Sequence, residues 1–499
     1  MDTEPPLSSL KRFFIHYSHF IGGSVFSLLV GLVSFPILTR ILTREEYGIM
    51  GLVSTTMFLA VAIAKAGLSD GVIRFYKDYE GTQEKRNIFS STVVVRGMLL
   101  ASITVLMYGI IFPTISKYLN IDRQYLICFM IMSAYLLIRP LNIIVLNILR
   151  VTGRTIFFNV TSLIGKLTAF GGSLILLLYV FGSLYGYFIG LVLSEFIVSI
   201  ILFSWFFTRY KVVLSKVSGS LAIDLIKFGI PLLITELSYL LLSYADRYMI
   251  AFYKGADAVG LYSVGYNVAS YISDTMMFSL SYAVVPIYLS LHQKEGRKKT
   301  EEFLQRCLHY LLIIIIPICI GYTLVSRDLL LALATDKYLQ AATFSPIILL
   351  GAFFLGMNNI LNAGLYLEKK TRIILAIMLS AVTINIVMNL LLLPVYGIMG
   401  SAVATLTACM AATILTVIFS FRHLTIKINT RLLIYHAALS GIMALVIVQI
   451  DLRTAWMDLA VKVLAGMLII FLGILVLESE IRDRIKTALQ FKKPLYGIR

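Results

Sequence analysis

The feature that most constrains this chain is a series of apolar runs, each about as long as a helix that crosses a lipid bilayer. The hydrocarbon core is about 30 Å thick, which requires roughly 20 helical residues. About fourteen such runs are separated by charges or turn residues. They lie near 13–35, 47–68, 88–112, 124–148, 156–180, 184–207, 228–250, 260–290, 304–325, 342–366, 373–393, 397–420, 432–450 and 456–477. Membrane β-barrels show shorter strands of alternating polarity. We therefore expect an all-α polytopic membrane protein with about 14 transmembrane helices.

Composition supports the same class. Hydrophobic residues make up 59% of the 499 residues and charged residues only 14%, outside the range of ordinary soluble chains. The net charge of +17 comes from short basic clusters between apolar runs, without the long basic tract that would favour nucleic acid. We expect a membrane protein that binds no nucleic acid.

The distribution of basic residues predicts the orientation, because Lys and Arg are retained on the cytoplasmic side during insertion. With the N-terminus inside, the inward segments hold 29 of the 43 Lys and Arg residues, the outward segments hold 8, and 6 fall within spans. A wrong helix count would scramble this asymmetry. We expect both termini to be cytoplasmic.

Several classes of active site are absent from the sequence. No connection between spans exceeds about twenty residues, and neither GxxxxGK[ST] nor HExxH occurs. The nearest fragment to a phosphate-binding loop, IGKLT at 164–168, lies inside a span and lacks the upstream glycine. The four cysteines lie in or at apolar spans without close pairing and are interpreted as small core residues. We expect no enzyme activity, no cofactor, no catalytic residue and no metal site.

Matching segments suggest an internal repeat. REEYGIMGLVS at 44–54 resembles ADAVGLYSVGY at 256–266, and LLLYVFGSLYG at 176–186 resembles LLLLPVYGIMG at 390–400. The offset stays near 212 to 218 residues. Six spans per half is an even number, so the relating axis runs along the membrane normal. The predicted division is two six-helix bundles, residues 1–210 and 211–425, with two extra transmembrane helices and a cytoplasmic tail at 426–499.

Three segments resemble a known family. They are FPILTRILTREEYG (35–48), GIPLLITELSYLLLSYADRYMIAFYKGADAVGLYSVGYNVA (229–269) and LPVYGIMGSAVAT (393–405). The chain is similar to the Wzx-type polysaccharide and oligosaccharide flippases of the multidrug/oligosaccharidyl-lipid/polysaccharide exporter superfamily. This resemblance implies two six-helix bundles around a central cleft, and a substrate of polyprenyl-diphosphate-linked glycan moved across the bacterial cytoplasmic (inner) membrane.

Ionisable residues within the spans are the candidate site. Each would cost about 2.5 to 3.5 kcal/mol near the bilayer centre, and together roughly 20 kcal/mol if they faced lipid. We therefore expect them to face protein or a wet cavity. They are Arg96, Arg139, Lys166, Glu195, Glu236, Arg247 and Asp274.

The basic members are the candidate substrate-binding residues. Guanidinium and ammonium groups bind diphosphate or carboxylate, which assigns this role to Arg96, Arg139, Lys166 and Arg247, with Arg40 at the outer rim. The alternatives are structural: interhelical contacts that hold a bundle together, an interfacial Arg247 neutralised by Asp246, and a loop salt bridge between Arg40 or Arg44 and Glu45 or Glu46.

The acidic members are the candidate ion-coupling residues. Glu236, Asp274 and Glu195 could bind a proton or sodium ion, each form favouring a different cleft opening. The alternative for all three is structural pairing, for Glu195 as a counter-ion of Lys166.

These expectations converge on a flippase for lipid-linked oligosaccharide that works by alternating access and is coupled to a proton or sodium gradient. Its expected partners are the polyprenyl-diphosphate-linked oligosaccharide, membrane lipids and other polysaccharide assembly proteins. The alternative on the same fold is a proton- or sodium-coupled antiporter of small cationic molecules. A membrane-embedded glycan ligase or polymerase would need a long outward loop, which the chain lacks.

Overall fold

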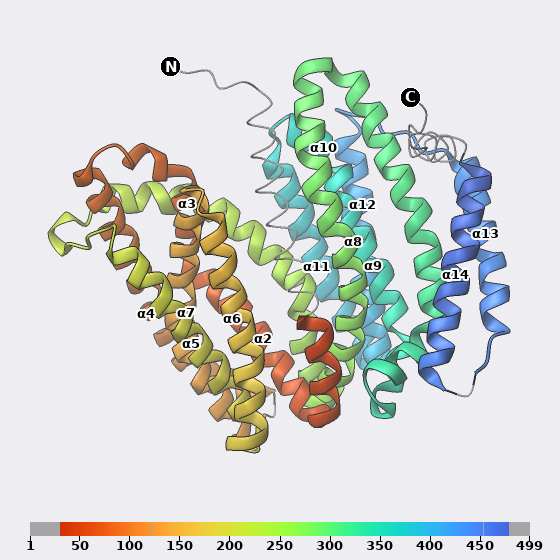
Figure 1. The fold of residues 1–499 in the computed structure, drawn as a ribbon, viewed down its shortest axis with the longest axis horizontal. Coiled ribbons are helices and arrows are strands. Elements are labelled where there is room, and N and C mark those ends of the chain that lie inside the picture. Colours follow the sequence, from red (N-terminus) through yellow and green to blue (C-terminus); the bar gives the residue numbers. More distant parts are fainter. Residues whose placement is uncertain (1–29, 120, 453, 479–499) are drawn as a thin grey trace, which may run out of the picture. The chain divides into compact units, whose positions relative to one another are not determined.

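The computed structural model describes residues 30–119, 121–452 and 454–478, apart from the side chains of 278–283 and 455. These ranges are almost entirely helical and contain no strand (Figure 1). The predicted all-α polytopic architecture is confirmed. The first predicted span, 13–35, lies mainly outside the described residues, which begin with the short apolar helix Val30–Ile41.

The remaining elements follow in chain order. They are α2 (Arg44–Lys65), α3 (Leu68–Phe75), η1 (Tyr76–Tyr79), α4 (Gln83–Tyr118), α5 (Arg123–Val151), α6 (Thr155–Ile175), η2 (Leu176–Val180), α7 (Leu184–Phe207), η3 (Leu214–Lys216), α8 (Gly219–Leu333), η4 (Asp336–Thr343), α9 (Ser345–Leu361), α10 (Ala363–Leu367), α11 (Thr371–Tyr396), α12 (Ile398–Ser420), α13 (Thr430–Val448) and α14 (Ala455–Leu477).

Twelve helices of the described ranges are long and apolar enough to cross a membrane. Each predicted span from 47–68 onward overlaps one of them. The protein is therefore a multi-pass membrane protein, as the apolar runs predicted.

The element α8 is a run of 115 helical residues, and two glycines divide it. A straight helix of that length would extend about 170 Å, several times the thickness of a bilayer. Gly255 and Gly296 both have φ of +81°, a left-handed conformation that glycine adopts without strain. Gly255 lies between the predicted spans 228–250 and 260–290, and Gly296 lies between 260–290 and 304–325. Where the sequence predicts a connection between two spans, the helix is therefore interrupted at a single glycine and not by a non-helical loop.

Two compact units make up the chain. Among the described residues, one combines those from 30 to Ser263 with Leu375–Ala408, and the other combines Val264–Ile374 with those from Cys409 to Glu478. This grouping follows close packing and does not test the predicted repeat. In the first unit, α5 packs against α4 and α7, and α6 packs against α7 (Figure 1).

The start of α2 shows how local sequence fixes an element of the first unit. Thr43 and Glu46 form a capping box: the Thr43 hydroxyl accepts from the Glu46 N–H at 3.1 Å, and Glu46 Oε2 accepts from the Thr43 N–H at 2.8 Å. Both backbone donors would otherwise lack helical partners. The segment TREE therefore starts this helix directly after the short helix Val30–Ile41.

Candidate functional site

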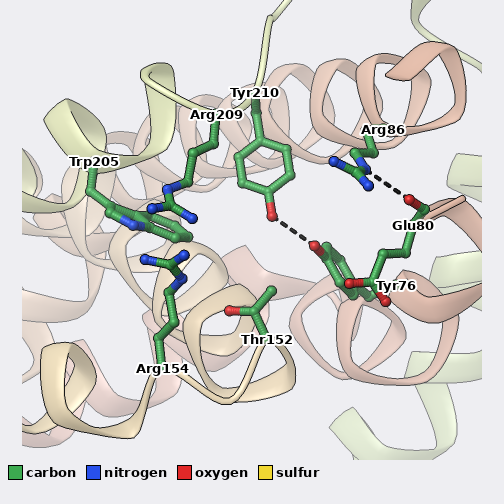
Figure 2. Close-up of a pocket in the computed structure, with 8 residues that line it drawn as sticks. All are labelled: Tyr76, Glu80, Arg86, Thr152, Arg154, Trp205, Arg209 and Tyr210. Carbon is green, nitrogen blue, oxygen red and sulfur yellow. Dashed lines mark hydrogen bonds between the residues drawn. The ribbon is translucent and has the colours of Figure 1, made fainter. Parts of the chain in front are cut away.

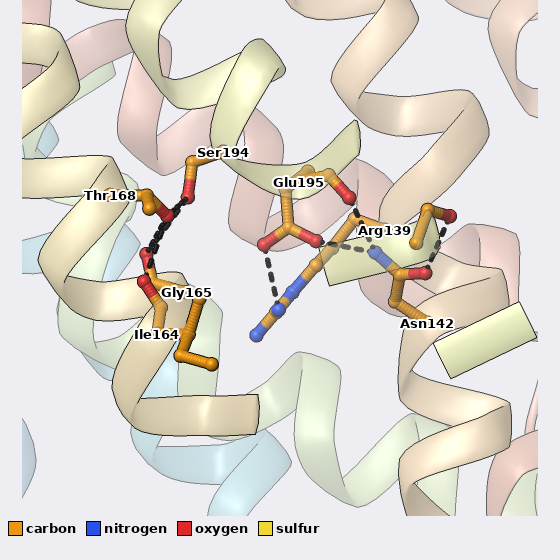
Figure 3. Close-up of polar contacts among 8 residues, drawn as sticks. Arg139, Asn142, Ile164, Gly165, Thr168, Ser194 and Glu195 are labelled. Atoms are coloured by element: carbon orange, nitrogen blue, oxygen red, sulfur yellow. Dashed lines mark hydrogen bonds and ion pairs between the residues drawn. The ribbon is translucent and has the colours of Figure 1, made fainter. Parts of the chain in front are cut away.

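A charged network joins α5 and α7 in the first unit. Arg139 Nη1 donates to Glu195 Oε1 at 2.8 Å (Figure 3). Asn142, almost one helical turn after Arg139, donates to the other carboxylate oxygen at 2.8 Å and to the Glu195 carbonyl at 3.0 Å. Ser199 in turn donates to Asn142 Oδ1 at 2.8 Å. The Glu195 carboxylate is thus fixed from two sides, and its counter-ion is Arg139.

Arg139 is hydrogen-bonded but only partly buried. Its side chain is 34% exposed, against 12% for Glu195, and Glu195 is its hydrogen-bond partner among the described residues. Pro140 follows directly within α5 and has no N–H to donate to the preceding turn, which loosens the helix here. The guanidinium therefore keeps donors that an anionic ligand can use.

Lys166 of α6 lies close enough to Arg139 for their positive charges to repel each other. The same stretch of α6 is attached to α7 by Thr168, whose hydroxyl is 2.7 Å from that of Ser194, and Ser194 donates to the Gly165 carbonyl at 2.8 Å (Figure 3). The structure thus brings together Arg139, Lys166 and Glu195 from three helices. Arg139 and Lys166 thus contribute two positive charges here, and Glu195 is bound to Arg139.

Arg96 of α4 is half-buried and makes no ion pair among the described residues. Its buried Nε also lacks a hydrogen-bond partner there. A buried donor without an acceptor costs about 1–3 kcal/mol. Arg96 is therefore a further cation with capacity for an anion.

Glu236 of α8 is paired with Lys65, a residue outside the set of predicted site residues. Lys65, at the end of α2, donates to both Glu236 oxygens at 2.7 and 3.0 Å. Asp70 on α3 lies close enough to Lys65 and Glu236 for both charges to affect its pKa. Burial raises the pKa of the Asp70 carboxyl, and Glu236 adds to the shift while Lys65 opposes it. This cluster has two carboxylates for one lysine.

Arg247 is buried, with 3% of its side chain exposed. It lies 3.6 Å from Asp246 Oδ1, donates to the Ser243 carbonyl at 3.0 Å, and sits 4.8 Å from the centre of the Tyr244 ring. Its guanidinium is surrounded by protein and does not reach outward to solvent along its stem.

Asp246 belongs to a buried oxygen-rich network that was not predicted from the sequence. Its Oδ2 accepts from the Tyr262 hydroxyl and lies 3.5 Å from the Thr405 hydroxyl of α12. Thr405 accepts from Asn385 of α11 at 3.2 Å, and Asn389 donates back to Asn385. The spacing of Asn385 and Asn389, four residues apart on one helix, was the available signal, because such positions share a face.

Three oxygen or hydroxyl groups of this region are buried without a hydrogen-bond partner among the described residues. They are Asp246 Oδ1, Asn389 Oδ1 and Ser401 Oγ. Buried polar atoms of this kind are uncommon in native proteins, and a bound water or ion is one explanation for them. Carboxylate, amide and hydroxyl oxygens suit a hard cation, and a carboxylate can also take a proton.

The remaining candidates lie apart from these networks. Arg40 is exposed and donates to the Pro36 carbonyl at 3.1 Å. Arg44 pairs with Asp257 at 2.6 Å, while Glu46 serves the helix cap. Asp274, in the second unit, is exposed and makes no ion pair among the described residues.

Comparison with known families gives two matches. The family model described as polysaccharide biosynthesis protein matches residues 18–292, more than half of the chain. The MatE family model matches residues 231–391.

Two archaeal proteins are similar over part of their length. An uncharacterized membrane protein of Methanocaldococcus jannaschii is 28% identical over 207 residues, and the probable flippase AglR of Haloferax volcanii is 26% identical over 181 residues. These matches cover 40% and 35% of this chain and 39% and 37% of the relatives. The chain thus spans about two fifths of the length of the curated relatives that it matches.

Solved structures share the fold. Lipid II flippase MurJ in an inward closed conformation aligns with a TM-score of 0.75 at 17% identity, covering 93% of this chain and 99% of that chain. A multidrug resistance MATE family transporter of the MOP superfamily, in an inward-facing conformation, aligns with a TM-score of 0.66 at 14% identity, covering 79% and 94%. The fold is therefore of the MurJ and MATE type.

Proposed function

The chain belongs to the polysaccharide biosynthesis protein family, and on this premise we propose that it is a flippase for an oligosaccharide linked to a polyprenyl diphosphate. The headgroup enters a cleft that is open to the cytoplasm, and a change to an outward-open state releases it on the other side. The prenyl tail stays in the lipid. Differential affinity of the two states for the substrate and for a coupling ion drives the exchange.

The observation that carries this proposal is a group of basic side chains within the spans of the first unit, Arg96, Arg139 and Lys166. Arg139 and Lys166 lie close together with Glu195 bound to Arg139, and Arg96 has no ion-pair partner among the described residues. A diphosphate carries the complementary charge, and Arg139 can bind it through a planar fork of donors. A cationic cargo would meet repulsion at the same place. Arg247 and Arg40 remain proposed contributors to substrate binding.

Coupling to an ion gradient is the second part of the proposal. Asp246 is the acid best suited to exchange a proton or sodium ion, because it is 1% exposed and its Oδ1 lacks a hydrogen-bond donor. Asp246 Oδ1 also lies 3.6 Å from Arg247, but Glu236 and Glu195 are in closer ion pairs, at 2.7 and 2.8 Å, which ion exchange would have to break. Asp274 remains a coupling candidate in the second unit.

The proposed location is the cytoplasmic membrane, with both termini on the cytoplasmic side. The excess of Lys and Arg in the inward segments supports this orientation. The expected interaction partners besides the substrate are membrane lipids and other proteins of polysaccharide assembly.

Deletion of the gene followed by analysis of prenyl-linked glycans tests the function. We expect a lipid-linked oligosaccharide to accumulate on the cytoplasmic side, and purified protein in vesicles to move that lipid to the opposite leaflet. Arg139→Gln should reduce this movement, whereas Arg74→Gln, a change at an exposed arginine outside the charged networks, should not. Normal lipid-linked glycan levels in the deletion strain, together with export of small cations by the vesicles, would establish the antiporter instead.

A further inference from the structure

A pocket lies at one end of the first unit, apart from the Arg139 network. It has a volume of about 400 Å³. At about 30 Å³ per water molecule, it has room for roughly a dozen waters. Its lining residues are Tyr76, Glu80, Arg86, Thr152, Arg154, Trp205, Arg209 and Tyr210 (Figure 2). None of them takes part in the charged networks described above.

Three arginines and one glutamate are among the residues that line this pocket. The guanidinium carbons of Arg154 and Arg209 lie 5.6 and 5.5 Å from the centre of the Trp205 ring, so two cations stack on one indole. The third, Arg86, points toward the tyrosines and is oriented by a 2.7 Å bond from its Nε to the Glu80 carbonyl (Figure 2). Cation–π contact holds the guanidiniums in place while leaving their N–H donors available for a ligand.

The base of the pocket is rigid. The Tyr210 and Tyr76 hydroxyls are 2.7 Å apart, and Tyr210 stacks on Phe206 with ring centres 4.9 Å apart. Burial raises the pKa of Tyr210, so this hydroxyl stays protonated at neutral pH and can donate. The chain after Tyr210 is fixed to α4, because Ser90 donates to the Lys211 carbonyl at 2.9 Å and Ser91 accepts from the Val213 N–H.

The position of the pocket indicates which side a ligand comes from. Its residues lie in and directly after η1, at the start of α4, between α5 and α6, and at and just after the end of α7. All of these segments are cytoplasmic in the predicted orientation, at the level where lipid headgroups meet water. Basic pockets at this level recognise phosphorylated headgroups, and tryptophan is favoured there.

We propose that this pocket binds the phosphate group of an anionic ligand on the cytoplasmic side. Arg86, Arg154 and Arg209 supply the charge-assisted donors. The phosphate belongs either to the headgroup of an anionic membrane lipid or to a soluble phosphate compound. The inference does not depend on the proposed flippase activity, because binding alone tests it.

The chain provides its own reporter, since it contains only two tryptophans, Trp205 and Trp456. Trp456→Phe leaves Trp205 as the single tryptophan of the full-length protein, located in the pocket. We would titrate this protein in detergent with inorganic pyrophosphate, dioctanoyl phosphatidic acid and dioctanoyl phosphatidylcholine, and follow tryptophan fluorescence. Saturable changes are expected with the first two ligands and none with phosphatidylcholine.

Arginine variants in the same background test the site itself. Arg154→Gln combined with Arg209→Gln should raise the titration midpoint at least about tenfold, the loss expected from removing hydrogen bonds to a charged group. Arg154→Lys with Arg209→Lys keeps the charge. Its titration midpoint should lie between those of the parent and the double glutamine variant. Arg74→Gln, which removes another guanidinium stacked on a ring, is the matched control and should titrate like the parent.

The outcomes separate clearly. A midpoint far lower for phosphatidic acid than for pyrophosphate identifies a lipid as the source, and similar midpoints identify a soluble phosphate. Identical titrations of the parent and the double variant, equal response to phosphatidylcholine, or no saturable change would overturn the proposal. If the double variant unfolds in a thermal scan, the single variant Arg86→Gln replaces it, with the same expected direction.

Discussion

Gly48 of α2 and Gly260 of α8 pack backbone against backbone. A Cβ added to Gly48 would overlap the carbonyl oxygen of Ala256, and a Cβ added to Gly260 would overlap that of Arg44. These two glycines occupy equivalent positions in the two matching segments of the sequence. The matched segments therefore meet at a helix crossing in the first unit, where only a residue without a side chain allows so close an approach.

Gly260→Ala should therefore destabilise the protein by about 1–3 kcal/mol, because the helices must separate to accommodate the methyl group. The measurement is the thermal unfolding midpoint in detergent. Gly109→Ala on α4 is the control, since a Cβ there meets nothing within 4 Å. That change should leave the midpoint unchanged or slightly higher, as alanine favours helix over glycine. Equal midpoints for the two variants would contradict the tight crossing.

The sequence predicted the helices well because the length and apolarity of a span are local properties. It also identified Arg139 and Glu195 as ionisable residues that lipid could not accommodate. Their pairing was not predicted, since three acids and four bases within spans allow many combinations and residue spacing orders only those on the same helix. Glu195 was considered as a partner of Lys166, and the structure shows Arg139 in that place.

Contacts between distant segments account for what the sequence missed. Asp246 was considered only as the neighbour of Arg247, yet Tyr262 and Thr405 also approach it, and Thr405 comes from a helix 159 residues later. The basic pocket around Trp205 was overlooked for the same reason. Its three arginines come from separate connections between predicted spans, and their convergence depends on how α4, α6 and α7 pack.

The Arg139–Glu195 pair predicts a double-mutant result. Arg139→Gln leaves the Glu195 carboxylate without its cation and should cost about 1–3 kcal/mol, less than a fully buried pair because Arg139 is 34% exposed. Adding Glu195→Gln should restore much of the stability, since no charge is then left alone. Thermal unfolding gives the coupling energy of the pair.

Measuring transport by the double variant shows whether Arg139 binds the substrate or only pairs with Glu195. If Arg139 binds the substrate, the stable double variant should remain defective in moving lipid-linked oligosaccharide across vesicles. Full recovery of transport along with stability would assign the pair a structural role alone.

Asp70 predicts a dependence on pH. Burial raises its pKa in the folded protein, so the ionised form destabilises the fold, and this cost is absent below the pKa of the unfolded chain, about 3.9. Asp70→Asn removes the cost. The stability gained by the variant should therefore grow as the pH rises from about 4 to 7.

Thermal midpoints of the parent and Asp70→Asn at several pH values measure this gain. Asp78→Asn, at an exposed position on η1, controls for the loss of a negative charge from the same segment. A gain that is constant with pH, or that shrinks toward neutral pH, would contradict a raised pKa for Asp70 in the folded protein.

Glu478 joins two histidines in the second unit. Its Oε1 lies 3.1 Å from His309 Nε2 of α8 and 3.0 Å from His436 Nε2 of α13. Glu478→Ala should lower stability by about 2 kcal/mol, because it leaves the buried His436 and the partly buried His309 without this partner. Glu302→Ala removes an exposed pair with Lys299 and should have a much smaller effect, because exposed ion pairs contribute little to stability. Thermal unfolding of both variants makes the comparison.

Asp246 provides the test of ion coupling. Asp246→Asn keeps an oxygen that can accept from the Tyr262 hydroxyl but removes the charge that a proton or sodium ion would neutralise. We expect transport driven by an imposed proton or sodium gradient to be at least about tenfold slower in vesicles with this variant. Substrate binding should persist. The reason is that an amide has the same charge in both states of the cycle and gives the ion no differential affinity.

Asp274→Asn, at an exposed acid of the second unit, is measured in parallel. Unchanged gradient-driven transport would remove Asp274 from the coupling residues, and a loss equal to that of Asp246→Asn would require both acids in the cycle. Comparison of proton and sodium gradients then identifies the ion, since the oxygen-rich surroundings of Asp246 suit sodium whereas the carboxylate alone suffices for a proton. Normal coupling in Asp246→Asn would remove Asp246 from the coupling residues, and Glu236, with Lys65 and Asp70 beside it, would become the next acid to test.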